Sequence, residues 1–529
     1  MSTRPIDALI VGGGPAGLAT AIRLKAQLAG TNPDASVVVL DKAPRPGSHS
    51  ISGAAFEPAC LDELVPGWRD DRRFMEHVNP VLRDEMYYLL GSRSIQIPPR
   101  LVPASMHHTN DVTISVGRLI AFLAEKAEKA GVEIYSGYTA RKLLVEGDRV
   151  TGVRLGEVGL STHGDKANHR PSEDISARVT ILADGSRGVL SQQLRDRFGG
   201  GKNPQVYSLG IKALVKFPGE NRYGPNRVMH TLGYPNPNSV FGGGFLYSMD
   251  EQTVAVGLIL GLDWKYGDLN PQAEFERFRK HPFIADLLRG SVTVATAART
   301  IPEGGYHSLG RLAVPGAIVV GDGAGFVNME KIKGIHYAIL SGMAAAETVA
   351  PSLAAEAPAD EAVRTSGYVA KLEERGVLPD MRHARNYRQA FRWGTIFGAP
   401  LSMVQSKLPV RLGIEADAKG TRKGARINRP APGGMDGATF VALTGSLHRE
   451  DEPAHMAVLD PQKCISCEAD YANSCTHFCP GQVYRWDGAK ILLSASNCLH
   501  CMTCAVKCPE ENILWQPPEG GEGPRFKQM

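Results

Sequence analysis

Three features of the sequence predict an α/β protein with several domains. A glycine-rich strand–helix–strand pattern opens the chain, two cysteine arrays stand near its end, and 529 residues exceed one compact core. The net charge of +4 is too close to balance to indicate nucleic-acid binding. We find no apolar run long enough to cross a bilayer. Only a few residues precede the first predicted strand, so we expect no signal or transit peptide.

The N-terminal pattern predicts a dinucleotide-binding unit. Residues 7–14 form a short apolar strand that runs into glycines, a helix-like stretch follows, and the next strand, SVVVL, leads into Asp41. Within the motif G-x-G-x-x-G, Gly12 would permit the tight turn, Gly14 would let a pyrophosphate approach the backbone, and Gly17 would let helix and strand pack closely. The helix N-terminus offers N–H groups to phosphates, and Asp41 would accept hydrogen bonds from a ribose. The motif does not distinguish FAD from NAD.

Two later strand-like segments indicate FAD. They are VTILADGSRGVL, whose strand ends at Asp184-Gly185, and GAIVVGDGAGFVN, whose strand ends at Gly321-Asp322. Each alone could be an ordinary strand-to-turn junction, but flavoprotein hydroxylases and their relatives carry similar motifs around FAD. Together with the N-terminal motif they predict a Rossmann-like FAD domain of the glutathione-reductase/hydroxylase type, assembled from separated segments of the chain.

Eight of the nine cysteines lie between residues 464 and 508 and predict iron–sulfur ligation; we expect Cys60 to be a small buried apolar residue. The arrays read C-x2-C-x7-C-x3-C-P and C-x2-C-x2-C-x3-C-P. In two-cluster ferredoxins the fourth cysteine of each array binds the other cluster. One predicted ligand set is therefore Cys479, Cys498, Cys501 and Cys504, and the other is Cys464, Cys467, Cys475 and Cys508. Zinc also binds C-x2-C pairs, and the second set could instead be a decayed site.

The sequence resembles the electron transfer flavoprotein–ubiquinone oxidoreductase family over nearly its whole length. The segments that carry the resemblance include GGGPAGLATAIRLK, FGGGFLYSMDE, FVNMEKIKGIHYAILSGMAAAE, ALTGSLHREDEPAHM and NCLHCMTC. The resemblance implies FAD, a [4Fe–4S] cluster and a ubiquinone site on a monotopic membrane protein. Such a protein takes electrons from electron transfer flavoprotein and passes them to ubiquinone. A one-electron donor and a two-electron acceptor explain why one chain would carry both a cluster and a flavin.

The resemblance also implies roles for particular residues. The cluster ligands would be Cys479, Cys498, Cys501 and Cys504, the same set that the ferredoxin spacing predicts. The quinone headgroup would contact the backbone at Gly242 and Gly243, in a stretch that could also be a plain glycine-rich turn before a strand. The chain departs from the mitochondrial-type pattern in its four additional cysteines and in Phe241, which stands in place of a tyrosine. The missing transit peptide indicates a bacterial enzyme, which we expect on the cytoplasmic face of the inner membrane.

Residues 391–408 predict the membrane contact. An apolar face recurs at three- and four-residue steps, through Trp393, Ile396, Phe397, Leu401, Val404 and Leu408. Residues 382–429 hold eleven Lys or Arg and two acids, which suits an anionic lipid surface. The alternative is an amphipathic helix that packs on the protein's own core. The proline-rich loop 95–106 is a second candidate, and we expect His107-His108 at the surface and a hairpin or loop over 156–174.

These predictions divide the chain into three regions and leave other functions open. The FAD domain would comprise 1–75, 110–195 and 295–350, the α+β quinone domain 76–109, 196–294 and 351–435, and the ferredoxin-like domain 436–529. An alternative is a related flavoprotein with another acceptor, such as a bifurcating-complex subunit or an isoprenoid reductase. A flavin hydroxylase using NADPH and oxygen and a non-catalytic electron-carrier subunit are further alternatives.

Overall fold

The computed structural model describes residues 5–53, 55–108, 110–164, 166–354, 362–527 and 529. Its first large sheet contains the predicted strand–helix–strand unit, with strand order β19-β20-β13-β1-β2-β8 and with β10 and β9 added on antiparallel to β13. The pairs β1–β2, β1–β13, β2–β8 and β13–β20 are parallel. The strands are β1 (Ile6–Val11), β2 (Val37–Asp41), β8 (Glu133–Ser136), β9 (Ala140–Glu146), β10 (Arg149–Leu155), β13 (Asp174–Leu182), β19 (Ala313–Val314) and β20 (Ala317–Val319).

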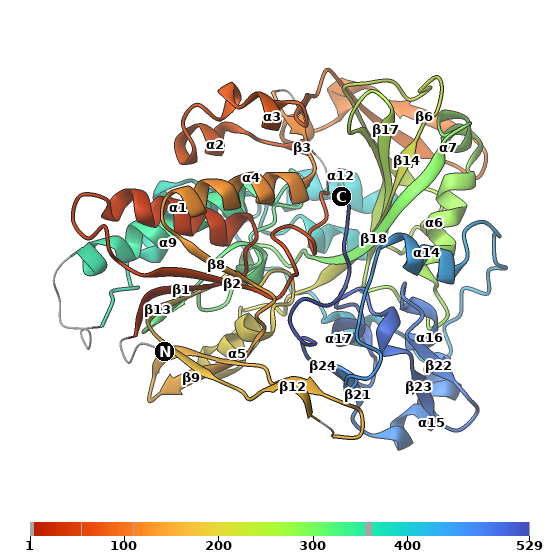
Figure 1. Ribbon diagram of the computed structural model, residues 1–529. Helices are drawn as coiled ribbons and strands as arrows, with labels where there is room; N and C mark the ends of the chain where they lie inside the picture. Colours follow the sequence, from red (N-terminus) through yellow and green to blue (C-terminus); the bar gives the residue numbers. More distant parts are fainter. Residues whose placement is uncertain (1–4, 54, 109, 165, 355–361, 528) are drawn as a thin grey trace.

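Helices cover this sheet and complete the first core. Strand β1 carries a continuous apolar run that is fully buried over Ala8–Val11, as expected of a parallel strand covered on both faces. Helices α1, α4 and α9 pack against one another over one side of the sheet (Figure 1). Cys60 in α2 is buried in this core, as predicted. The helices are α1 (Pro15–Leu28), α2 (Ala59–Leu64), α3 (Arg72–Met75), α4 (Val116–Lys129), α5 (Val189–Phe198), α8 (Gly321–Ala324), α9 (Ile335–Ala354), α10 (Tyr368–Glu374) and α11 (Val377–His383).

The second large sheet has the order β18-β14-β17-β16-β15-β5-β6 and is antiparallel except between β15 and β5. Helix α6 packs on it, with Phe275 and Phe278 in its core. Strand β18 spans residue 295, the predicted start of the third FAD segment, and pairs here with β14. The elements are β5 (Arg83–Leu89), β6 (Ser94–Ile97), β14 (Tyr207–Lys216), β15 (Arg227–Gly233), β16 (Gly242–Ser248), β17 (Thr253–Gly261), β18 (Val292–Pro302), α6 (Pro271–Lys280) and α7 (Pro282–Leu287). A small sheet of β3 (Ala55–Phe56), β7 (Val112–Thr113) and β4 (Asn79–Pro80) lies apart from both.

The C-terminal region is built from short helices and two antiparallel strand pairs, β21–β24 and β22–β23. It packs against the second sheet (Figure 1) through α14, where the Thr296 hydroxyl donates to the Phe440 carbonyl at 2.6 Å. The elements are α13 (Asp417–Gly420), α14 (Gly437–Leu443), β21 (Met456–Val458), α15 (Pro461–Tyr471), α16 (Cys475–Phe478), β22 (Tyr484–Trp486), β23 (Ile491–Leu493), α17 (Cys504–Lys507) and β24 (Ile513–Trp515).

The predicted amphipathic segment 391–408 is shorter than expected. Gly394, at φ +82°, separates a 3-10 turn, Arg388–Trp393, from helix α12, Thr395–Gln405. Among the described helices, none is long and apolar enough to cross a bilayer. In the stretch 156–174, β11 (Val158–Leu160) and β12 (Lys166–Arg170) pair antiparallel, which confirms the expected hairpin.

Candidate active site

A cavity of about 890 Å³ lies between the two large sheets and the C-terminal region. The carboxyl ends of β1, β13 and β20 open into it, as is usual for ligand sites in parallel sheets. Of the predicted cofactor-binding residues, Gly17 alone does not line it; those that do are Gly12, Gly14, Asp41, Asp184, Gly185, Gly242, Gly243, Gly321 and Asp322. The folded chain therefore brings these separated segments to one site.

The three glycines of the N-terminal motif stand in different surroundings. A Cβ on Gly12, at φ +112°, would lie 2.1 Å from the Ala183 carbonyl oxygen, so this turn requires glycine. A Cβ on Gly17 would lie 2.0 Å from the Gly12 oxygen, which explains why Gly17 serves packing and does not reach the cavity. Nothing lies within 4 Å of the place where a Gly14 Cβ would stand. The backbone at Gly14 and the N-terminus of α1 thus leave an open cradle that fits a pyrophosphate.

Two of the predicted carboxylates are engaged by the chain itself. Asp41 accepts hydrogen bonds from the backbone N–H groups of Gly13 and Ala43, both at 2.7 Å. Burial raises the pKa of Asp41, and these two N–H groups oppose that rise. Asp184 accepts from the N–H of Leu190 at 2.8 Å and from the Ser191 hydroxyl, so its carboxylate orders the start of α5. Contact of either carboxylate with a ribose or another part of a cofactor stays a prediction.

Buried cations that sequence reasoning missed also line the cavity. Burial lowers the pKa of Lys42 to about 8, assisted by the nearby guanidinium of Arg299. Burial raises the pKa of Asp322 to about 6, against the attraction of Arg299. The Lys42 Nζ lies 3.4 Å from His500 Nδ1, beside the second cysteine array. Single basic residues carry no motif, so only their convergence in space identifies them.

Four buried sulfurs gather beside this cavity and fit a [4Fe–4S] cluster. They belong to Cys479, Cys498, Cys501 and Cys504, the predicted first set, and the described cysteines form no disulfide. Burial, together with the neighbouring Cys501 thiol, raises the pKa of Cys498 to about 12. Backbone N–H groups of Val483 and His500 lie 3.5 Å from the Cys479 and Cys498 sulfurs, and the Thr503 hydroxyl lies 3.3 Å from the Cys501 sulfur. Bound iron would make thiolates favourable in this dry setting.

Models of protein families match most of the chain. One described as "Electron transfer flavoprotein-ubiquinone oxidoreductase, 4Fe-4S" matches residues 434–527, and one described as "ETF-QO, ubiquinone-binding" matches 207–301. An NAD(P)-binding Rossmann-like domain model matches 10–65, and an FAD binding domain model matches 73–206.

Similar curated proteins cover nearly the full length. The probable mitochondrial electron transfer flavoprotein-ubiquinone oxidoreductase of Schizosaccharomyces pombe is 37% identical over 98% of this chain and 85% of its own length. The chain belongs to the electron transfer flavoprotein–ubiquinone oxidoreductase family. The Pseudomonas aeruginosa member is 34% identical over 99% of this chain and 98% of its own length. The human mitochondrial member is 34% identical over 99% of this chain and 89% of its own length.

Solved structures with related folds are flavoproteins. A geranylgeranyl bacteriochlorophyll reductase-like protein from Thermoplasma acidophilum has a TM-score of 0.55 at 18% identity, covering 77% of this chain and 93% of that one. The flavin-dependent brominase Bmp2 has a TM-score of 0.52 at 16% identity, covering 75% of this chain and 89% of that one. At these identities the likeness concerns the fold alone.

The ubiquinone-binding match of this family member includes Gly242 and Gly243 at the start of β16. A Cβ on Gly242 would lie 2.0 Å from the Ile259 oxygen, and one on Gly243 would lie 2.1 Å from the Thr231 oxygen. Both positions therefore require glycine for strand packing as well as for any close approach of a ligand. The neighbouring Phe241 packs edge-on against Phe391, with ring centroids 4.6 Å apart. This position, where the mitochondrial-type pattern has a tyrosine, therefore makes an apolar contact.

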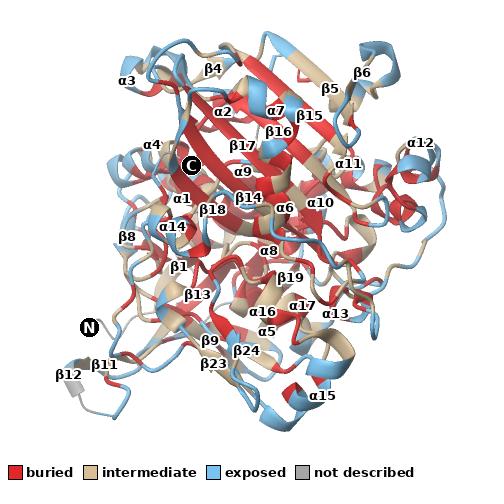
Figure 2. Cartoon of the chain, turned by 90° about the vertical axis from the view of Figure 1, so that its right-hand side faces the viewer, coloured by how far each residue is buried: buried red, intermediate tan, exposed pale blue. Residues whose placement is uncertain are grey.

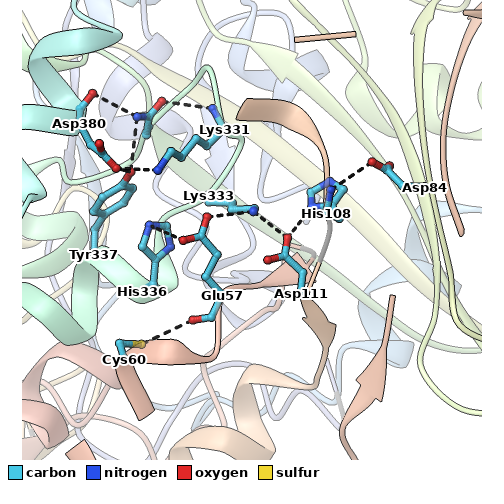
Figure 3. Close-up of polar contacts among 11 residues, drawn as sticks. Glu57, Cys60, Asp84, His108, Asp111, Lys331, Lys333, His336, Tyr337 and Asp380 are labelled. Atoms are coloured by element: carbon cyan, nitrogen blue, oxygen red, sulfur yellow. Dashed lines mark hydrogen bonds and ion pairs between the residues drawn. The ribbon is translucent and has the colours of Figure 1, made fainter. Parts of the chain in front are cut away.

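A polar network (Figure 3) reaches the cavity through Lys333. The Asp111 carboxylate lies 2.6 Å from Lys333 Nζ and 2.8 Å from His108 Nδ1, and Lys333 also reaches Glu57 at 3.0 Å. The His230 ring stacks on His108 with centroids 5.2 Å apart. Lys333 and His230 line the cavity, so the network connects its interior to the partly exposed Glu57.

The expected surface position of His107-His108 is wrong for His108. This side chain is 1% exposed, because its backbone N–H donates to Asp84 at 3.1 Å while its ring meets Asp111. His107 is half-buried, with Nδ1 3.3 Å from Asp84. Asp111 lies only three residues from His108, whereas Asp84 comes from strand β5, and no motif in the sequence links the three residues.

Alanine substitutions at Gly14 and Gly12 will separate cofactor binding from folding. Gly14→Ala places a methyl group in the open cradle, so we expect the apoprotein to melt normally while FAD affinity falls at least about tenfold, roughly 1.4 kcal/mol. Gly12→Ala, which clashes with Ala183, should lower the melting temperature of the apoprotein as well. Flavin titration and thermal melts measure the two effects. Undiminished FAD affinity in Gly14→Ala would show that the cradle does not contact the cofactor.

His336 should make the folded protein sensitive to mild acid. Burial lowers its pKa to about 4, and its Nε2 has no hydrogen-bond partner among the described residues. The unfolded chain, with a histidine pKa near 6.5, then binds more protons between pH 6.5 and pH 4. Stability is complete above this window and is lost as the pH falls through it, by about 2 kcal/mol between pH 7 and pH 5 from this residue.

The measurement compares melting temperatures at pH 7 and pH 5. Between pH 7 and pH 5, the melting temperature of His336→Gln should fall less than that of the unmodified protein. The melting temperature of the control His163→Gln, at an exposed position, should fall as much as that of the unmodified protein. Identical acid sensitivity in His336→Gln would contradict the assignment.

Proposed function

We propose that this family member oxidises reduced electron transfer flavoprotein and reduces ubiquinone. The observation that carries the proposal is one cavity whose wall combines the nucleotide-binding turns, Gly242 and Gly243, and residues His500 and Met502 of the cysteine loop. When bound, a [4Fe–4S] cluster and FAD allow electrons to be accepted one at a time from the donor and delivered as a pair to the quinone. The protein's part is to place these groups close together and to exclude water between them.

Residues of the chain take separate parts in this arrangement. Gly12, Gly14 and the N-terminus of α1 would hold the pyrophosphate of FAD. The four cysteines of the first set would hold the cluster, with amide N–H groups directed at the sulfurs of Cys479 and Cys498. The quinone headgroup would approach the backbone of Gly242 and Gly243. The quinol oxygens require two protons, and Lys333 and His230 bring exchangeable protons to the cavity wall.

Helix α12 supports a membrane contact at the mouth of the cavity. Its buried residues are small or polar: Thr395, Gly398, Ser402 and Gln405. The predicted apolar face is exposed instead, through Trp393, Ile396, Phe397, Leu401, Val404 and Leu408. Phe397 is 70% exposed and Val404 66% exposed, which argues against the alternative that this face packs on the protein's own core.

The loop 95–106 stands at the same mouth. Ile97, Leu101 and Met106 of the loop and Pro400 and Met403 of α12 all line the cavity. Leu101 is 63% exposed. An apolar rim with basic residues beside it suits insertion into the headgroup region of a bilayer, from which a quinone could enter directly. We therefore propose a monotopic position for the protein, on the cytoplasmic face of a bacterial inner membrane.

A turnover assay tests the proposed reaction. The purified holoprotein should transfer electrons from reduced electron transfer flavoprotein to a soluble ubiquinone analogue, and NADPH with oxygen should not replace the donor. Flavin that becomes reduced while no quinol forms would favour the alternative of a related flavoprotein with another acceptor. NADPH oxidation that depends on oxygen would favour the hydroxylase alternative.

Polar substitutions on α12 test the membrane contact. The double variant Phe397→Ser, Val404→Ser should bind anionic phospholipid vesicles at least about tenfold more weakly in a sedimentation assay. Burying each of the two apolar side chains in the bilayer would contribute about 1.5–3 kcal/mol to binding. Val369→Ser, at a 47% exposed valine on α10, is the matched control and should bind vesicles normally. Equal vesicle binding by the double variant and the control variant would exclude α12 as the anchor.

A further inference from the structure

The second predicted set of cysteines brings four more sulfurs together. Cys464, Cys467, Cys475 and Cys508 line one small internal cavity at the base of α15, α16 and α17. Because all four residues line the same small cavity, the two arrays converge there. The described cysteines form no disulfide, so these thiols are free to bind a metal.

The backbone at the third and fourth cysteines is alike in the two arrays. Helices α16 and α17 each begin at the third cysteine of an array and end just before the fourth. In both arrays the residue four positions beyond the fourth cysteine directs its N–H at that sulfur. The distances are 3.5 Å from Val483 to Cys479 and 3.4 Å from Asn512 to Cys508. The enlarged gap in the first array thus leaves the backbone at the third and fourth cysteines unchanged. The first two cysteines differ, because Cys464 and Cys467 lie on helix α15 whereas Cys498 and Cys501 lie in a loop.

Polar groups directed at the small cavity indicate a ligand inside it. The Asn512 side chain is 3% exposed, and its Nδ2 lies 3.6 Å from the Cys464 sulfur. Asn473 and Ser474 also line the cavity and are each 1% exposed. Within the described part of the chain, the Asn473 amide atoms and the Ser474 hydroxyl have no hydrogen-bond partner. Unpaired polar groups buried this deeply are rare unless a ligand, ion or water satisfies them.

We propose that Cys464, Cys467, Cys475 and Cys508 hold a second [4Fe–4S] cluster. Each array then supplies three ligands to one site and its fourth cysteine to the other, the exchange found in two-cluster ferredoxins. A decayed site would have no reason to retain four converging thiols together with N–H donors aimed at their sulfurs. Zinc would need the same four thiolates, so the metal itself is what the experiment must identify.

The position of this site makes it the outer one. The first site borders the large cavity through His500 and Met502. The second lies beside the first, because α16, which begins at Cys475, contacts α17, which begins at Cys504. Helix α15, which carries Cys464 and Cys467, lies at the end of the molecule far from β6 in both Figure 1 and Figure 2. The exposed Ile465 on the same helix faces solvent.

This order rests on the proposed function and deepens it. An electron that enters at α15 would pass from the outer site to the inner site and then to the cavity. In each transfer between the two sites, one cluster would be oxidised by one electron and its neighbour reduced by one. No proton would move and no bond would form or break. The outer site is accordingly the one nearest a soluble protein donor, on the side away from the apolar rim.

Metal analysis of the anaerobically purified holoprotein tests the proposal directly. We expect about eight irons and eight acid-labile sulfides per FAD, four for each cluster, and no stoichiometric zinc. About four irons per FAD, or four irons with one zinc, would overturn the proposal. Because this ratio does not depend on turnover, a protein with eight irons that fails to reduce ubiquinone would overturn the proposed function alone.

Variants assign the additional irons to these residues. Cys467→Ser and Cys508→Ser should each lose about four irons while keeping FAD and the inner cluster, and Cys60→Ser, at a buried thiol outside both sites, should keep all eight. The reduced unmodified protein should show the broadened EPR signal of two interacting clusters, and the Cys467→Ser variant a simple single-cluster signal. Retention of eight irons by Cys467→Ser would place the second cluster elsewhere. If Cys508→Ser loses its flavin as well, the Cys467→Ser result decides.

Asn512 provides a readout that does not depend on losing the cluster. Asn512→Leu removes the side-chain N–H near the Cys464 sulfur and keeps the backbone N–H at Cys508. Because hydrogen bonds to the sulfurs favour the reduced cluster, the midpoint potential of the outer cluster should become more negative. The inner cluster in the same molecule is the internal control and should keep its potential. An unchanged pair of potentials would contradict the placement of Asn512 at the outer cluster.

Discussion

The contact between the cysteine loop and strand β18 sets the geometry on which the rest of the molecule depends. The Thr300 N–H donates to the Cys501 carbonyl at 3.1 Å, and the Thr300 hydroxyl meets the Ser186 hydroxyl at the same distance. One buried residue thus joins the first sheet, the second sheet and the cluster-binding loop. Buried Lys507 adds a second connection by donating to the Trp264 carbonyl at 2.7 Å. Because electron transfer needs short separations, these hydrogen bonds are part of the function as well as of the fold.

The cavity that results is polar and charged on one side and apolar on the other. Lys42, Arg299 and Asp322 are buried there at a cost in desolvation, which the directions of their pKa shifts record. A phosphate-bearing, redox-active ligand can offset that cost by pairing with Lys42 and Arg299. Towards Leu101 and Met403 the lining becomes apolar and reaches an exposed rim. One end therefore suits a charged cofactor and the other a substrate that dissolves in lipid.

One alternative that the sequence left open and one correction show the limits of reasoning from spacing. The apolar stripe of 391–408 was visible in the sequence, but a stripe does not say whether protein or lipid covers it. The structure buries Ser402 and Gln405 and leaves Phe397 outside, which reverses the usual arrangement of a surface helix. His108 is buried because Asp111, three residues along the chain, contacts its ring, and Lys333, from a distant segment, contacts Asp111; no motif in the sequence indicates this network.

The sequence by itself determined the strand–helix–strand unit at Gly12–Asp41 and the family, and it predicted the division of the cysteines into two ligand sets. Each depends on short-range spacing, because turns, helix starts and cluster loops are built from residues a few positions apart. Only the tertiary structure decided which buried charges meet in the cavity, which side of α12 faces outward, and how the two cysteine sites lie relative to the cavity. Those features depend on contacts between segments hundreds of residues apart, which packing of the two sheets and the C-terminal region brings together.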